Sequence, residues 1–81
     1  MTRSAMLSLD VLETVWSRWH EVKYGYPMSQ RYRTLHRHNI KAREFESWLF
    51  ENGAEVKQIN KERRLRFYNE QHATLFLLRW S

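Results

Sequence analysis

The chain has 81 residues, of which 42% are hydrophobic and 15% aromatic, and its formal net charge is +5 at pH 7. This length suits a single small domain (1–81), and the apolar content excludes a disordered tail. Because the chain contains no cysteine, it has no disulfide, thiolate metal site or cysteine nucleophile. It also lacks a signal-peptide pattern and any apolar run long enough to span a bilayer. We therefore expect a cytoplasmic protein with no membrane partner.

The first predicted helix runs over about residues 10–23, after a loose tail at residues 1–7. Asp10, with Glu13 three residues later, has the spacing of a capping box, and Gly25 is the expected stop. Its apolar residues recur at the spacing of one helical face: Leu12, Val15, Trp16, Trp19 and Val22.

Two further helices are predicted in the middle of the chain. Ser29 is a candidate cap for a short helix that ends near Arg37, and an ordered loop is the alternative there because the segment has few apolar residues. Asn39 is a stronger cap for a third helix, which should end at Asn52-Gly53. The apolar face of this third helix consists of Ala42, Phe45, Trp48 and Leu49.

A β-hairpin is predicted after Gly53, because apolar and polar residues alternate over 54–57 and again over 64–67. Burial of one face places Val56 opposite Leu65 and leaves Asn60-Lys61 as a two-residue turn. The same register places Glu55 opposite Arg66, which is favourable, and Lys57 opposite Arg64, which is not.

The last segment is predicted as a short helix over 70–75 followed by a strand over 76–80, with one continuous helix as the alternative. Asn69 is a good cap, whereas Phe76, Leu78 and Trp80 alternate as in a strand. The expected fold class is α+β, with two or three helices packed on one face of a small antiparallel sheet that contains a β-hairpin.

The last residue, Ser81, is preceded by the segment Phe67-Tyr68-Asn69-Glu70-Gln71-His72-Ala73-Thr74-Leu75-Phe76-Leu77-Leu78-Arg79-Trp80. This ending resembles those of short uncharacterised bacteriophage proteins, which often close with Phe, two or three acidic or polar residues and then Ala-Thr-x-Phe-x-Leu-Arg-Trp. The resemblance covers about the last quarter of the chain. It implies a bacteriophage origin, and hence the cytoplasm of a host cell, but no activity and no functional residue.

A basic segment is the feature that indicates a function. No acidic residue lies between Glu21 and Glu44, and three tyrosines are interleaved with the basic residues there. Arginine matches phosphate with a planar fork of donors, and flat rings beside cations suit unstacked bases. The sequence thus predicts a nucleic-acid-binding protein with mainly phosphate contacts. The residues expected to bind are Arg31, Arg33, Arg37, Lys41 and Arg43, with Lys61, Arg63 and Arg64 of the hairpin.

A winged-helix arrangement is one specific form of this hypothesis. Three helices followed by a hairpin have the order of that motif, whose third helix enters the major groove. Glu44, Glu46 and Glu51 lie on the predicted third helix and would face phosphate unfavourably. A non-specific contact of the arginines with the nucleic-acid backbone is the simpler expectation.

The alternative function is a protein-binding modulator of a host or viral protein. Such a protein would use exposed aromatics, of which Trp16 and Phe50 are candidates, together with the basic face against an acidic partner, and it could form a homodimer. The hypotheses differ in geometry. Nucleic-acid binding through this set predicts that Arg31, Arg33 and Arg37 share a surface with the hairpin tip, whereas protein binding predicts an exposed apolar patch away from that charge, or a dimer. A charged run can also be only a solvated face.

No catalytic, metal or cofactor site is predicted. His36 and His38 are the only close histidine pair, and without cysteine or an acid before Glu44 they make a poor metal site. Glu44 and Glu46 diverge on a helix, and we identify no base near Ser17, Ser29 or Ser47 in sequence. We therefore expect that the protein is not an enzyme and has no cofactor.

Overall fold

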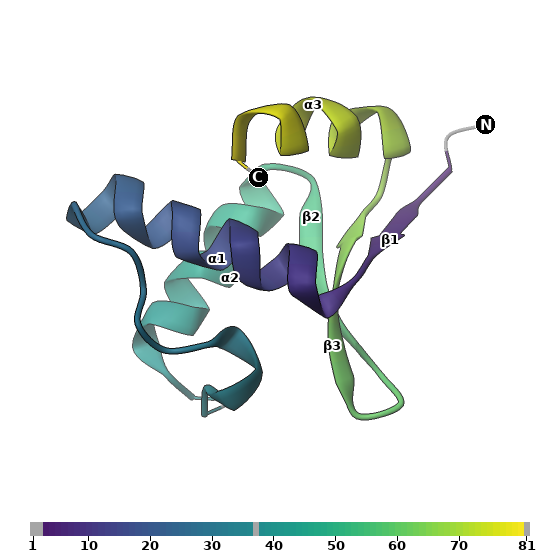
Figure 1. Ribbon diagram of the computed structural model, residues 1–81. Helices are drawn as coiled ribbons and strands as arrows, with labels where there is room; N and C mark the ends of the chain where they lie inside the picture. The colour runs from purple at the N-terminus through teal and green to yellow at the C-terminus, as the bar shows by residue number, and fades with distance from the viewer. Residues whose placement is uncertain (1–2, 37, 81) are drawn as a thin grey trace.

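A computed structural model describes residues 3–36 and 38–80. Helices cover one face of a three-stranded antiparallel sheet with strand order β1-β3-β2, which confirms the predicted α+β class (Figure 1). Its elements in chain order are β1 (Ala5–Leu7), α1 (Leu9–Tyr24), the 3-10 helix η1 (Tyr32–Thr34), α2 (Ile40–Glu51), β2 (Ala54–Ile59), β3 (Glu62–Phe67) and α3 (Glu70–Trp80).

The loose tail predicted for residues 1–7 is wrong over Ala5–Leu7, which form the edge strand β1. Ala5 pairs with Phe67 and Leu7 with Leu65, so both half-buried side chains join the core face of the sheet while Met6 points outward. The Glu70 amide also donates to the carbonyl of Arg3 at 2.8 Å. The prediction missed this strand because three residues are too few to establish an alternating pattern.

Helix α1 follows the predicted boundaries, but its cap is Ser8 rather than Asp10. The Ser8 hydroxyl accepts a hydrogen bond from the Val11 amide at 3.4 Å, and Asp10 lies in the first turn, where a carboxylate suits the helix dipole. Gly25 ends the helix as predicted, with φ of 88° and its amide bonded to the Glu21 carbonyl at 2.8 Å.

The second predicted helix is wrong except for one short turn. Only η1 forms between Ser29 and Asn39, and Arg37 lies outside the described residues. Tyr32 and Leu35 are both buried at a spacing of three, which a 3-10 turn places on one side. With no further apolar residue to bury, the segment gains nothing from a longer helix. The third helix, α2, begins after Asn39 and ends before Asn52-Gly53 as predicted.

The hairpin is confirmed in register and turn. Val56 pairs with Leu65 and Lys57 with Arg64, and both residues of the Asn60-Lys61 turn have positive φ, 51° and 67°. Such angles are those of a type I′ turn, whose twist suits the flanking strands. The turn projects from the end of the sheet opposite α3 (Figure 1).

The C-terminal segment is one helix, α3, so the preferred prediction of a strand over 76–80 is wrong and the alternative of a continuous helix is right. Ala73 and Phe76 are buried, and Leu77 and Trp80 pack beside them at helical spacing. Leu78, which a strand would have buried with Phe76, is 81% exposed. β3 already has a neighbour on each side, so a further strand would have had to pair at an outer edge.

The core consists largely of aromatic rings between the helices and the sheet. Trp16 stacks on Trp19 at a centroid distance of 5.5 Å, and its ring meets Phe45 edge-on at 5.1 Å and Tyr32 at 5.3 Å. These contacts hold η1 against α1 and α2. Among the described residues, no helix has the length and apolar character needed to cross a membrane.

Candidate nucleic-acid interface

The predicted nucleic-acid-binding residues do not form one surface. Arg37 lies outside the described residues. Arg33, Lys41, Arg63 and Arg64 are engaged in contacts within the protein. Among residues 3–36 and 38–80, the side chains of Arg31, Arg43 and Lys61 form no hydrogen bond or ion pair.

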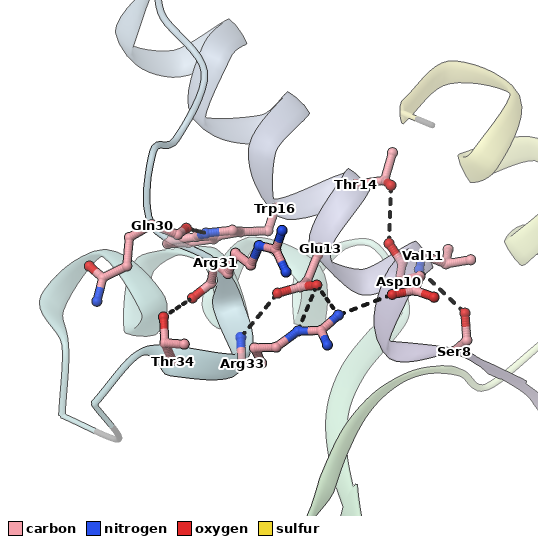
Figure 2. Close-up of polar contacts among 10 residues, drawn as sticks. All are labelled: Ser8, Asp10, Val11, Glu13, Thr14, Trp16, Gln30, Arg31, Arg33 and Thr34. Carbon is pink, nitrogen blue, oxygen red and sulfur yellow. Dashed lines mark hydrogen bonds and ion pairs between the residues drawn. The ribbon is translucent and has the colours of Figure 1, made fainter.

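Arg33 is neutralised by two carboxylates of α1 (Figure 2). Its Nε donates to Glu13 Oε1 at 3.0 Å, its Nη2 donates to Asp10 Oδ1 at 3.0 Å, and its backbone amide donates to Glu13 Oε2 at 3.3 Å. The hydrogen bond from the Arg33 side chain holds the pKa of Glu13 below its ordinary value. Arg33 therefore links η1 to the start of α1. Because its charge is already paired, it is a poor ligand for phosphate.

A cavity of about 590 Å³ lies beside this ion pair, between α1 and the segment 28–33. Its charges are balanced, because Arg18 also pairs with Glu21 at 3.5 Å. Arg31 is the remaining cation and lies close to the Arg33–Glu13 pair (Figure 2). The cavity therefore has no preference for an anion. Its charged lining residues are Asp10, Glu13, Arg18, Glu21, Arg31 and Arg33.

Arg63 and Arg64 lie on opposite faces of β3. The guanidinium of Arg63 donates to the carbonyl oxygens of Tyr32 and Leu35 at 3.0 and 3.1 Å and lies 5.3 Å from the centre of the Tyr32 ring. Arg64 is on the outer face of the sheet, opposite Lys57, and pairs with Glu62 at 3.4 Å. The hairpin arginines thus do not act together at its tip.

The ammonium group of Lys41 is hydrogen-bonded to the buried side chain of His20. His20 has no exposed surface, its Nδ1 lies 2.8 Å from the Tyr26 carbonyl, and its Nε2 lies 3.1 Å from Lys41 Nζ. The carbonyl requires a proton on Nδ1, so Nε2 accepts from the ammonium group. Lys41 Nζ also lies 4.7 Å from the centre of the Tyr24 ring. The tyrosines expected to stack on bases instead surround His20 or, like Tyr32, lie in the core.

A second group of basic side chains lines a groove between η1, the first half of α2 and the hairpin, here called the η1–α2 groove. It has a volume of about 510 Å³. Arg43 and Arg63 line it together with the imidazoles of His36 and His38, and its only carboxylate among the described residues is Glu46. The remaining lining residues are Tyr32, Ala42, Val56 and Gln58.

The polar groups of the η1–α2 groove are arranged so that donors outnumber acceptors. Glu46 already accepts a hydrogen bond from the Tyr32 hydroxyl at 2.6 Å. Burial, and then this carboxylate, raise the pKa of Tyr32 far above its ordinary value, so the hydroxyl remains a donor. The His38 amide donates to His36 Nδ1 at 3.2 Å, which leaves the N–H of a neutral His36 on Nε2. Such a groove suits a small anionic group.

Two residues of this groove, Arg43 and Arg63, belong to the basic set predicted from the sequence. His36 and His38 were predicted to be solvated, and Gln58 was not singled out. A signal for Gln58 was present in the hairpin register, which pairs it with Arg63 and so places both on the face that carries Val56 and Leu65. His36 and His38 lie in the loop after η1 and line the groove from there. No sequence pattern predicted this placement of the two histidines.

Within the described part of the chain, no cluster of three or more His, Asp or Glu side chains could hold a metal ion. No protein-family model matches the sequence, and no curated protein or solved structure is significantly similar to it. The bacteriophage resemblance of the C-terminal segment therefore stays a prediction.

Proposed function

We propose that the protein binds nucleic acid through phosphate contacts centred on the η1–α2 groove. The observation that supports this is the grouping of Arg43, Arg63, His36 and His38 around one carboxylate that is already hydrogen-bonded. Guanidinium and imidazole donors recognise phosphate, and such contacts supply most of the sequence-independent affinity for nucleic acid.

The hairpin turn extends the proposed interface. Lys61 is exposed in the turn, a short distance along the hairpin from Gln58 and Arg63. The net charge of +5 adds a long-range attraction to a polyanion. Because the exposed rings Tyr24 and Tyr26 lie around His20 rather than in the groove, base stacking contributes little and sequence selectivity should be low. Glu44 and Glu51 on α2 argue against insertion of that helix into a major groove.

The proposal is tested by fluorescence anisotropy with labelled single- and double-stranded oligonucleotides at about 50 to 200 mM salt. Affinity should fall steeply with salt. The variant Arg43→Ala/Lys61→Ala should bind about tenfold or more weakly and reduce the salt slope by about 2, one for each lost phosphate contact. Arg18→Ala/Arg79→Ala removes the same charge away from the groove and is the matched control. Absence of binding at the lowest salt would exclude nucleic-acid binding, and equal losses in the two variants would exclude the η1–α2 groove as its interface.

A second candidate function is protein binding through the outer face of α2. Ile40 and Phe50 are 75% and 70% exposed there, with Arg43 and Ser47 between them. An exposed aromatic and an arginine are typical of an interface core. In a pull-down with the wild-type chain as bait, a protein partner should be captured that the variant Ile40→Ser/Phe50→Ser does not capture, while oligonucleotide binding is unchanged. Capture of the same partner by both proteins would exclude this face as the protein-binding site.

A further inference from the structure

We propose that phosphate binding in the η1–α2 groove is linked to proton uptake by His36 and His38, so that affinity for nucleic acid rises as pH falls. This inference depends on the proposed function, because it concerns the regulation of the same groove. Histidine is the side chain whose charge ordinarily changes between about pH 5 and 8, so a histidine pair at a phosphate site couples binding to pH.

The two imidazoles are close enough to act on one anionic group. Their ring centres are 5.5 Å apart, both side chains are exposed, and both line the groove. A neutral imidazole presents one N–H donor, whereas an imidazolium presents two and carries a charge. Proton uptake therefore increases both the number of donors and the positive charge that face a bound phosphate.

The other charged and titratable groups of the groove determine the direction of the linkage. Helix α2 contributes Arg43 and Glu46, β3 contributes Arg63, and η1 contributes Tyr32, whose hydroxyl is committed to Glu46. Strand β2 contributes only the uncharged Val56 and Gln58. A bound phosphate adds negative charge beside both imidazoles, so binding and protonation favour each other.

The pair is not symmetric. His36 accepts the His38 amide hydrogen bond at Nδ1, so a second proton on His36 would displace that contact. No described residue forms a hydrogen bond to the His38 ring. His38 is therefore the imidazole that can present both N–H groups to a phosphate, with His36 donating through Nε2. The expected order of effects on the pH dependence is His36→Gln/His38→Gln, then His38→Gln, then His36→Gln.

The test is the oligonucleotide dissociation constant at constant ionic strength from about pH 8 to about pH 5.5. Wild-type affinity should rise by about fivefold or more over that range. The increase should be lost in His36→Gln/His38→Gln and kept in His72→Gln, an exposed histidine on α3 that serves as the matched control. Circular dichroism of each variant at both pH values establishes that the chain is folded. Titration with inorganic phosphate, followed by NMR of the imidazole Cε1–H signals, locates the proton uptake.

The outcomes separate this inference from the proposed function. Binding that does not change with pH, or that loses its pH dependence equally in His72→Gln, overturns the proton linkage and leaves nucleic-acid binding standing. If phosphate shifts the imidazole NMR signals of His72 but not those of His36 or His38, the proton linkage is likewise overturned. No oligonucleotide binding at any pH overturns both. Loss of the pH dependence in the groove variant alone supports the linkage.

Discussion

The guanidinium of Arg63 lies over the ring of Tyr32, 5.3 Å from its centre, and donates to the Tyr32 carbonyl oxygen at 3.0 Å. A second donor reaches the carbonyl of Leu35 at 3.1 Å. The residue that the sequence places at a basic hairpin tip therefore connects β3 to η1, two segments about thirty residues apart in sequence. The Arg63 side chain also lines the η1–α2 groove, but both of its Nη atoms already donate to backbone carbonyl oxygens.

The first prediction follows from this connection. Arg63→Ala should lower the free energy of unfolding by about 1.5–3 kcal/mol, because hydrogen bonds from a charged donor to partly buried carbonyls are lost. Arg63→Lys keeps the charge but not the planar fork, so it should recover only part of the loss. Urea unfolding followed by tryptophan fluorescence measures both. Unchanged stability in Arg63→Ala would mean that its hydrogen bonds to Tyr32 and Leu35 do not stabilise the fold.

The second prediction concerns Glu13, whose pKa is lowered mainly by the hydrogen bond from Arg33. A carboxylate with a lowered folded-state pKa stabilises the fold above its unfolded value of about 4.5, and that contribution is lost as pH falls through the folded-state pKa. Wild type should therefore be more stable than Arg33→Gln at pH 7, and the difference should shrink towards pH 3. Thermal unfolding across this range measures it.

Arg18→Gln is the matched control for this pH series, because it removes an arginine whose pair with Glu21 is exposed on both sides. Exposed pairs contribute little to stability, so this variant should follow wild type at every pH. A difference between wild type and Arg33→Gln that stays constant down to pH 3 would show that the stabilisation by Arg33 does not depend on the charge of Glu13.

The third prediction separates stability from binding at the hairpin turn. Lys61 has φ of 67°, a conformation that costs a residue with a Cβ about 1 kcal/mol relative to glycine. Lys61→Gly creates the favoured Asn-Gly turn, so it should raise the free energy of unfolding by about that amount while it lowers oligonucleotide affinity. Asn60→Gly, at φ of 51°, keeps the charge and should change stability without changing affinity. Equal affinity in the two variants would exclude the turn from the interface.

Sequence patterns predicted those parts of the fold that local physics determines. Helix α1 and its stop at Gly25 follow from apolar spacing and the left-handed conformation of glycine. The register of the hairpin follows from the requirement that Val56 and Leu65 share one face. Each of these arguments depends on residues that are neighbours in the chain or across a two-residue turn.

The incorrect predictions concern contacts between distant segments. Arg33 and Glu13 are twenty residues apart, and nothing in the basic segment indicates that a carboxylate of α1 reaches it. Likewise, β1 exists because β3 has an open edge, and α3 continues as a helix because the core lies beneath Phe76 and Trp80. The basic segment therefore looked like one surface in sequence, although tertiary contacts divide it among a charge-balanced cavity, the buried His20 and the η1–α2 groove.

The final prediction concerns the carboxylate of that groove. The Tyr32 hydroxyl donates to Glu46 at 2.6 Å, while the Tyr32 ring is buried in the core. Tyr32→Phe keeps the ring packing and loses this hydrogen bond, at a cost of about 1 kcal/mol in the free energy of unfolding. The released carboxylate then repels phosphate, so oligonucleotide affinity should fall.

Glu46→Gln should have the opposite effect on binding, because it removes the only negative charge among the described residues that line the groove. Its affinity should exceed that of wild type by severalfold, and the gain should diminish at high salt, where charge interactions are screened. Glu51→Gln removes an equal charge from α2 outside the groove and is the matched control. If the two glutamine variants gain equally, net charge alone explains the effect. If Glu46→Gln gains nothing, phosphate does not bind beside Tyr32, and the proposed interface must be elsewhere.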